Sequence, residues 1–104
     1  MTREQVLLDA IEKVVGKREV DYGKPEDSFG SIAVLWNNWL DIRAHVPGFS
    51  GLEPVDVAAM MTILKLARLA TNPQHEDSWV DIAGYAACGA EIAAKTIPQL
   101  ELEL

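Results

Sequence analysis

Pro54-Val-Asp-Val-Ala-Ala-Met-Met-Thr-Ile-Leu-Lys-Leu-Ala-Arg-Leu-Ala-Thr71 is the stretch that decides the fold of this 104-residue chain. Apolar residues cover almost the whole circumference of the helix that this stretch predicts, and its leading proline suits the first helical turn. A helix that is apolar nearly all round lies at the centre of a bundle or at a subunit interface. We therefore expect residues 54–71 to be the central helix of the fold, ended by Asn72-Pro73.

Three further helices are expected around this one. Residues 3–16 and 27–44 carry apolar side chains at helical spacing, and residues 76–97 are rich in alanine and glycine, which lets neighbouring backbones approach closely. Residues 45–51 form a loop rich in proline and glycine, and no segment shows a useful length of β alternation. The sequence therefore predicts an all-α, four-helix bundle whose last two helices pack antiparallel at its centre.

Length, composition and charge restrict the class of protein. One helical domain is expected over residues 1–98, followed by an acidic tail over 99–104. No apolar run is long enough to span a membrane, the first residues lack a signal-peptide pattern, and the single cysteine fits a reducing cytoplasm. The formal net charge of −7 argues against broad binding to nucleic acid. We expect a cytoplasmic protein.

The same features bear on assembly. A chain of this length builds only a small core, and residues 54–71 offer few polar side chains to water. Burial against a second copy would cover that apolar surface. We expect a homodimer or a higher homo-oligomer that buries part of helix 54–71 or of helix 76–97.

Two aspartates stand out at the start of the last expected helix. Asp77 and Asp81 are four residues apart, so they share one face of that helix. Carboxylates one turn apart suit a hard cation such as Mg²⁺, or Mn²⁺ in its place, which bridges to substrate phosphates. The structural alternative is that Asp77 caps the helix while Asp81 faces water or pairs with a cation of helix 54–71.

Three charged residues interrupt the apolar helix 54–71. Asp56 lies in its first turn on an otherwise apolar face, and because burying a bare carboxylate is costly, it must be paired, cap the helix or bind a ligand. Lys65 and Arg68 lie one turn apart on the far side. They are suited either to bind phosphate or to pair with the acids of helix 76–97, and the sequence leaves both alternatives open.

The connection over residues 16–25 also carries candidate ligand-binding side chains. Lys17, Arg18 and Lys24 surround Tyr22, and three cations around an aromatic ring are suited to hold a phosphate and a base. The alternative is an ordinary polar connection. A length of about ten residues without a clear element favours a functional role.

Several segments of the chain resemble a family of small, largely uncharacterised phage and prophage proteins. The resemblance covers about residues 5–93 and is carried by Asp21-Tyr-Gly23, Trp36, Asp56-Val-Ala-Ala-Met-Met61, Lys65-Leu-Ala-Arg68 and Asp77-Ser-Trp-Val-Asp-Ile-Ala-Gly-Tyr85. That family is in turn distantly similar to the all-α nucleotide pyrophosphohydrolases of the MazG and dimeric dUTPase type. Those enzymes hold Mg²⁺ through Glu-x-x-Glu on one helix and Glu-x-x-Asp on a later one, and they convert nucleoside triphosphates to monophosphates and pyrophosphate.

The resemblance implies a MazG-like fold and Mg²⁺-dependent hydrolysis of the α–β phosphate bond of a nucleoside triphosphate. Asp56, Asp77 and Asp81 would be the metal ligands and the catalytic residues, with a metal-activated water as nucleophile. Other side chains would neutralise the phosphates or stack on the base, and the candidates for these roles are Lys17, Arg18, Lys24, Lys65, Arg68, Tyr22 and Tyr85.

The sequence departs from the enzyme pattern on both helices. Asp56 stands alone where the enzymes carry two acids, because the residue three positions later is Ala59. The later pair, Asp77 and Asp81, is spaced by four residues instead of three. Two other functions therefore stay open: a non-catalytic nucleotide-binding protein that sequesters a nucleotide signal of host defence, and a structural phage protein without a ligand.

Overall fold

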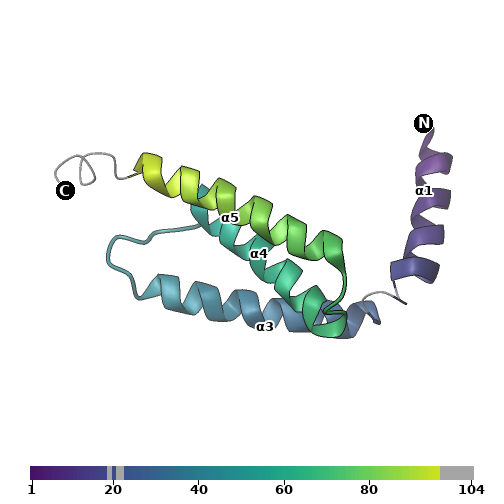
Figure 1. Cartoon of the computed structure of the whole chain (residues 1–104), viewed down its shortest axis with the longest axis horizontal. Coiled ribbons are helices and arrows are strands. Elements are labelled where there is room, and N and C mark those ends of the chain that lie inside the picture. Colours follow the sequence, from purple (N-terminus) through teal and green to yellow (C-terminus); the bar gives the residue numbers. More distant parts are fainter. Residues whose placement is uncertain (19, 21–22, 97–104) are drawn as a thin grey trace.

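The computed structural model describes residues 1–18, 20 and 23–96, and the described residues form helices and connections without a strand. The helices are α1 (Arg3–Glu12), the π-helical turn η1 (Lys13–Lys17), α3 (Pro25–Ala44), α4 (Pro54–Thr71) and α5 (Glu76–Thr96) (Figure 1). The all-α prediction is therefore confirmed. The expected acidic tail over 99–104 lies outside the described residues.

Helix α4 is the centre of the fold, as its apolar composition predicts, and its bounds are the expected ones. It packs against α5 on one side and against α3 on the other. Residues 72–75 connect α4 to α5, and so short a connection makes the two helices antiparallel neighbours (Figure 1). A Cβ atom placed on Gly89 would lie 3.2 Å from the Cβ atom of Ala58, so the absence of a side chain there permits the close approach of α5 to α4.

Helix α3 is joined to α4 by a hydrogen bond from a tryptophan. The Nε1–H of Trp36 donates to the backbone carbonyl of Met60 at 2.7 Å. The helix starts at Pro25, two residues before the expected start, because proline is well suited to the first helical position and Lys24 before it is extended. The Trp36 hydrogen bond fixes how α3 is rotated about its own axis, so that the side of α3 that carries Trp36 faces α4.

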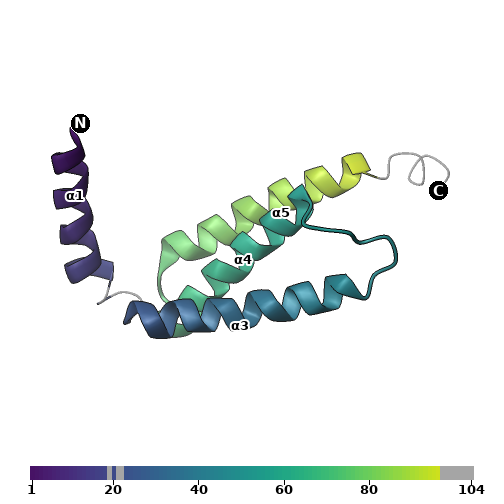
Figure 2. The same ribbon diagram turned by 180° about the vertical axis from the view of Figure 1, so that it is seen from behind.

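Helix α1 differs from the expectation of a four-helix bundle. It stands away from the body formed by α3, α4 and α5 (Figures 1 and 2). Its apolar side chains are exposed, and the buried apolar side chains of the described chain are only Ile32, Ala58 and Leu69. Within one chain, three helices pack as a bundle and the first does not, because periodicity predicts that a helix has an apolar face but not which surface covers it.

Among the described residues, no helix combines the length and the apolarity that crossing a bilayer requires.

Replacing Trp36 by phenylalanine is expected to lower the free energy of unfolding by about 1–2 kcal/mol, because the change removes a part-buried hydrogen bond and some packing volume. Trp79→Phe is the matched control. Its Nε1–H also donates to a carbonyl, that of Pro73 at 2.9 Å, but its side chain is exposed, so a change within about 0.5 kcal/mol is expected. Urea denaturation of both variants measures the difference, and equal losses would contradict the anchoring role of Trp36.

Candidate functional site

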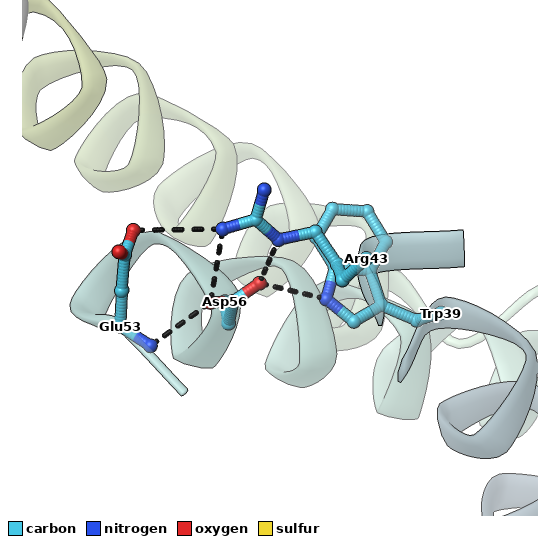
Figure 3. A network of polar contacts seen from close by, with 4 residues as sticks. All are labelled: Trp39, Arg43, Glu53 and Asp56. Atoms are coloured by element: carbon cyan, nitrogen blue, oxygen red, sulfur yellow. Dashed lines mark hydrogen bonds and ion pairs between the residues drawn. The ribbon is translucent and has the colours of Figure 1, made fainter. Parts of the chain in front are cut away.

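Asp56 lies at the centre of a polar network at the start of α4 (Figure 3). Its Oδ1 accepts hydrogen bonds from Trp39 Nε1 at 3.0 Å and from Arg43 Nε at 2.7 Å. Its Oδ2 accepts from the backbone N–H of Glu53 at 2.9 Å, as part of a capping box, and from Arg43 Nη2 at 3.4 Å. The carboxylate is fully buried and fully satisfied, so pairing and capping are the roles that the structure gives it.

The contacts of Asp56 and Arg43 with each other keep both of these groups ionised. Burial by itself raises the pKa of Asp56. A larger effect in the opposite direction comes from the hydrogen bonds of Arg43, the Glu53 backbone and Trp39, together with the Arg43 charge, and the pKa of Asp56 therefore lies below its usual range. The hydrogen bond to Asp56 in turn raises the pKa of Arg43. The guanidinium of Arg43 also lies 4.7 Å from the centroid of the Phe49 ring. The network therefore fastens the connection over residues 45–53 to the ends of α3 and α4.

A second polar cluster lies where η1 meets the junction of α4 and α5. It surrounds a cavity of about 310 Å³ that we call the basic pocket. The side chains that line the pocket are Lys13, Lys17, Arg18, Lys65, His75, Asp77 and Asp81.

The lining of the basic pocket has the opposite sign of charge to the chain as a whole. Four of its side chains are cations and two are carboxylates, whereas the whole chain carries a formal net charge of −7. A hollow lined mainly by one sign of charge raises the local concentration of ligands of the opposite sign. The pocket is therefore suited to an anion that carries several negative charges.

An ion pair crosses the pocket from α4 to α5. Lys65 Nζ lies 2.8 Å from Asp81 Oδ2, so the pairing alternative for these two residues is present in the structure. The side chain of Asp81 is 44% exposed and that of Lys65 is 15% exposed, so water reaches the pair from the Asp81 side and the pair contributes modestly to stability, about 1 kcal/mol. Both groups can therefore exchange partners at a small cost when a charged ligand enters.

The start of α5 orients one further side chain of the pocket. Nδ1 of His75 accepts the backbone N–H of Ser78 at 3.3 Å and lies 2.9 Å from the Ser78 hydroxyl oxygen. Ser78 is buried, so these contacts fix the rotation of the imidazole ring at the edge of the pocket. Asp77 lies in the first turn of α5 and is exposed.

The structure brings together five of the residues that the sequence predicts for the site. Lys17, Arg18, Lys65, Asp77 and Asp81 line the basic pocket. Arg68 lies one turn beyond Lys65 and lines a smaller neighbouring cavity together with Arg18.

Besides Arg68, three of the described predicted residues do not line the basic pocket. Asp56 lies in the network at the other end of α4, and Lys24 is the residue before α3. Tyr85 is half-buried on α5, four residues after Asp81, and Tyr22 lies outside the described residues. No group of three or more His, Cys, Asp or Glu side chains in the described part of the chain is arranged to hold a metal ion, so the expected set of three aspartates is not assembled there. The physical reason is that Arg43 and Trp39 occupy the carboxylate of Asp56.

Lys13 and His75 belong to the pocket but were not predicted from the sequence. Lys13 precedes Lys17 by four residues, and this spacing alone indicates that both cations share one face of a helix. His75 gave no such signal, because a single loop histidine without metal-ligand spacing occurs in many proteins.

Comparison with known proteins gives the relatives of the chain. Residues 5–93 match the family described as a domain of unknown function, DUF6378. The gene 55 protein of Mycobacterium phage L5 is 42% identical over 81 residues, which cover 78% of this chain and 47% of the relative. The gene 55 protein of Mycobacterium phage D29 is 34% identical over 85 residues, which cover 82% and 51%.

The chain thus spans about half the length of the curated relatives it matches. No solved structure matches it. The resemblance to a family of phage proteins is confirmed, and the more distant similarity to nucleotide pyrophosphohydrolases stays a prediction.

Proposed function

We propose that this chain, which belongs to the DUF6378 family, binds a nucleotide by its phosphate groups in the basic pocket. The observation that carries the proposal is the grouping of Lys13, Lys17, Arg18 and Lys65 around one cavity in a chain that is otherwise acidic. Ammonium and guanidinium groups donate charge-assisted hydrogen bonds to phosphate oxygens, and these bonds are stronger than neutral ones. The all-α fold agrees with the distant similarity to MazG-type proteins that the sequence predicts, and that predicted similarity is the reason for naming a nucleotide as the source of the phosphates.

Two carboxylates lie in the proposed phosphate site, and their negative charge would repel phosphate unless a cation lies between the carboxylates and the phosphate. Asp77 and Asp81 line the same cavity as the cations and are spaced by one helical turn. This donor set fits Mg²⁺ or Mn²⁺, because such an ion is commonly held by one or two carboxylates together with substrate phosphates. Asp77 and Asp81 would hold the ion, which would neutralise phosphate charge. Asp56 is not included, because its oxygens are filled by Arg43, Trp39 and the Glu53 backbone.

Binding would rearrange the ion pair between Lys65 and Asp81. In the single chain these two groups neutralise each other at 2.8 Å. A bound phosphate would take Lys65 as its partner and release Asp81 to face the divalent ion. Tyr85 follows Asp81 by four residues on α5, so it shares that helical face and is the candidate ring for stacking on the base. The protein would act in the cytoplasm, where nucleoside triphosphates are abundant.

Hydrolysis of the α–β phosphate bond is the second candidate function. The adjacent carboxylates of Asp77 and Asp81 favour it, since one of them can remove a proton from an attacking water. Binding without turnover is favoured by the position of Asp56 outside the pocket, which leaves two acids where three were expected.

Titration calorimetry with canonical ribo- and deoxynucleoside triphosphates and with cyclic nucleotides, each with and without Mg²⁺, tests the proposal. Chromatography of the same mixtures after incubation detects monophosphate and pyrophosphate. Heat of binding without products supports a binding protein, and products support the pyrophosphohydrolase. If none of these nucleotides binds under either condition, the proposal is wrong and a structural role without a ligand takes its place.

Asp81→Asn is expected to reduce the Mg²⁺-dependent part of nucleotide affinity at least about tenfold, because a divalent ion loses one of two charged ligands. The free energy of unfolding is expected to change by about 1 kcal/mol or less, because water reaches the ion pair with Lys65 at the Asp81 end. Glu91→Gln is the control, since Glu91 forms an exposed ion pair with Lys95 on the same helix at 3.4 Å. Equal affinity of the Asp81 and Glu91 variants in Mg²⁺ would remove Asp81 from the site.

A further inference from the structure

Two apolar surfaces of the chain lie uncovered in the single chain. The first is on the arm, by which we mean α1 and η1 together. Six apolar side chains of the arm are between 49% and 70% exposed, and these are Val6, Leu7, Leu8, Ile11, Val14 and Val15. Leu7, Ala10, Ile11 and Val14 follow the spacing i, i+3, i+4 and i+7, so they form one stripe along the arm. An apolar stripe this long on a protein surface marks an interaction site.

The second surface is a groove between α3 and α4. It is a cavity of about 240 Å³ lined by Phe29, Ile32, Ala33, Trp36 and Leu64. The four residues from α3 repeat the same helical spacing, and every lining residue is apolar apart from the Trp36 nitrogen, which bonds to Met60. A groove of this kind accepts the apolar face of an amphipathic helix.

The arm of the same chain is not in position to fill this groove. Lys13 and Lys17 of η1 line the basic pocket at the junction of α4 and α5. The backbone continues in helical conformation from α1 through Glu12 and Lys13 into η1, so the arm is one helical rod. That rod leads away from the body of the chain (Figures 1 and 2). Folding it back onto the groove would draw both lysines out of the pocket.

We infer that the arm of one chain seats its apolar stripe in the α3–α4 groove of a second copy, which places its own arm in the first. A reciprocal exchange of this kind closes as a two-fold dimer. It also explains why so few apolar side chains of the single chain are buried.

The surface available is large enough for a stable dimer. Fully burying one aliphatic side chain removes on the order of 60–120 Å² from water. The half-exposed side chains of two arms and two grooves together remove on the order of 1,200 Å², which reaches the lower bound for specific interfaces. The inference goes beyond nucleotide binding, and it implies that each arm is held at both ends: α1 on the partner copy and η1 at its own basic pocket.

Disulfide trapping tests the inference directly. In a Cys88→Ser background, a Leu7→Cys chain and an Ala33→Cys chain are co-expressed with different tags and mildly oxidised. Ala33 lies in the groove and is exposed, so a covalent heterodimer is expected on a non-reducing gel. A Glu12→Cys chain in place of Leu7→Cys is the matched control, because Glu12 lies on the polar face of α1, and it is expected not to cross-link.

The alternative occupant of the groove gives a different result. If a chain that carries both Leu7→Cys and Ala33→Cys forms an internal disulfide and stays monomeric, the arm covers its own groove and the inference is wrong. Absence of any cross-link between Leu7→Cys and Ala33→Cys chains also overturns it.

Light scattering gives an independent readout. The full chain is expected at twice the mass of one chain at micromolar concentration, and Ile11→Glu is expected to weaken dimerisation at least about 100-fold with unchanged helical circular dichroism. Val34→Glu makes the same chemical change at an exposed apolar residue of α3 outside the groove, and it is expected to stay dimeric. A monomeric wild type, or an Ile11→Glu chain that dimerises as tightly as wild type, contradicts the inference.

Discussion

Asp56→Ala is expected to lower the free energy of unfolding by about 3 kcal/mol. The change leaves Arg43, the Trp39 indole and the Glu53 backbone N–H without their shared acceptor. Breaking a buried ion pair from one side costs about 3–5 kcal/mol, and the lower end applies because Arg43 is 21% exposed and can turn toward water. Urea denaturation measures the loss, with Asp27→Asn as the control, since Asp27 is an exposed first-turn acid expected to matter by less than about 0.5 kcal/mol.

The same variant has an expected dependence on pH. The pKa of Asp56 is lowered by folding, so its contribution is fully present above the ordinary aspartate value of about 3.9 and is lost as pH falls below that value. The difference in unfolding free energy between wild type and Asp56→Ala is therefore expected to be constant above about pH 5 and to shrink below about pH 4. A difference that grows on acidification would show that the buried carboxyl is protonated in the folded chain.

Lys17→Glu is expected to weaken nucleotide binding by roughly 10- to 100-fold, because it replaces a phosphate-facing cation by a repelling carboxylate, and a charge-assisted hydrogen bond contributes about 1.5–3 kcal/mol. Lys24→Glu changes the net charge of the chain equally but lies before α3 and outside the basic pocket. Its affinity is expected to stay within about threefold of wild type at moderate salt, because Lys24 does not line the basic pocket and salt weakens its interaction with a ligand bound there. Calorimetric titration with the same nucleoside triphosphate compares the two variants.

Equal losses of affinity in the two variants would mean that the overall charge of the chain attracts the nucleotide and that the basic pocket does not. Unchanged affinity in both would remove Lys17 from the site. The position of the charge is the only difference between the variants, so the comparison isolates the pocket.

The central helix could be predicted from the sequence, because its signal is local. The apolar run, the proline at its start and Asn72-Pro73 at its end fix α4 without reference to the rest of the chain. The expected start of α3 at residue 27 lies two residues late, because Pro25 is at the first helical position and begins the helix earlier.

The role of Asp56 could not be decided from the sequence, because its partners are distant along the chain. Trp39 and Arg43 precede it by 17 and 13 residues, and they meet it only when α3 packs on α4. Its place on an apolar face predicted that the Asp56 carboxylate needs partners. In the structure these partners are the Arg43 guanidinium, the Trp39 indole and the backbone amide of Glu53. The pairing of Lys65 with Asp81 was one of two open alternatives for a similar reason, since nothing local distinguishes an ion pair from two ligand-binding groups.

The position of α1 could not be predicted, because it depends on the surface against which its apolar face packs, and the sequence of α1 does not identify that surface. Its periodicity correctly predicts an amphipathic helix. In the structure α1 stands away from α3, α4 and α5 (Figure 1), and its apolar side chains are exposed. Periodicity alone cannot tell such a helix from one that packs in a four-helix bundle.

The π-helical turn Lys13–Lys17 determines how far α1 is rotated about the helix axis relative to the residues that follow the turn. A π turn accommodates one residue more than an α-helical turn over the same backbone ladder. Deleting Val15 would convert this turn to ordinary α-helix and rotate α1, together with Lys13, by about 100° relative to Lys17. The composition and length of the arm would hardly change, yet its apolar stripe and Lys17 would no longer point in compatible directions. The extra residue of the π-helical turn therefore determines which way the apolar stripe of α1 faces when Lys17 lies in the basic pocket.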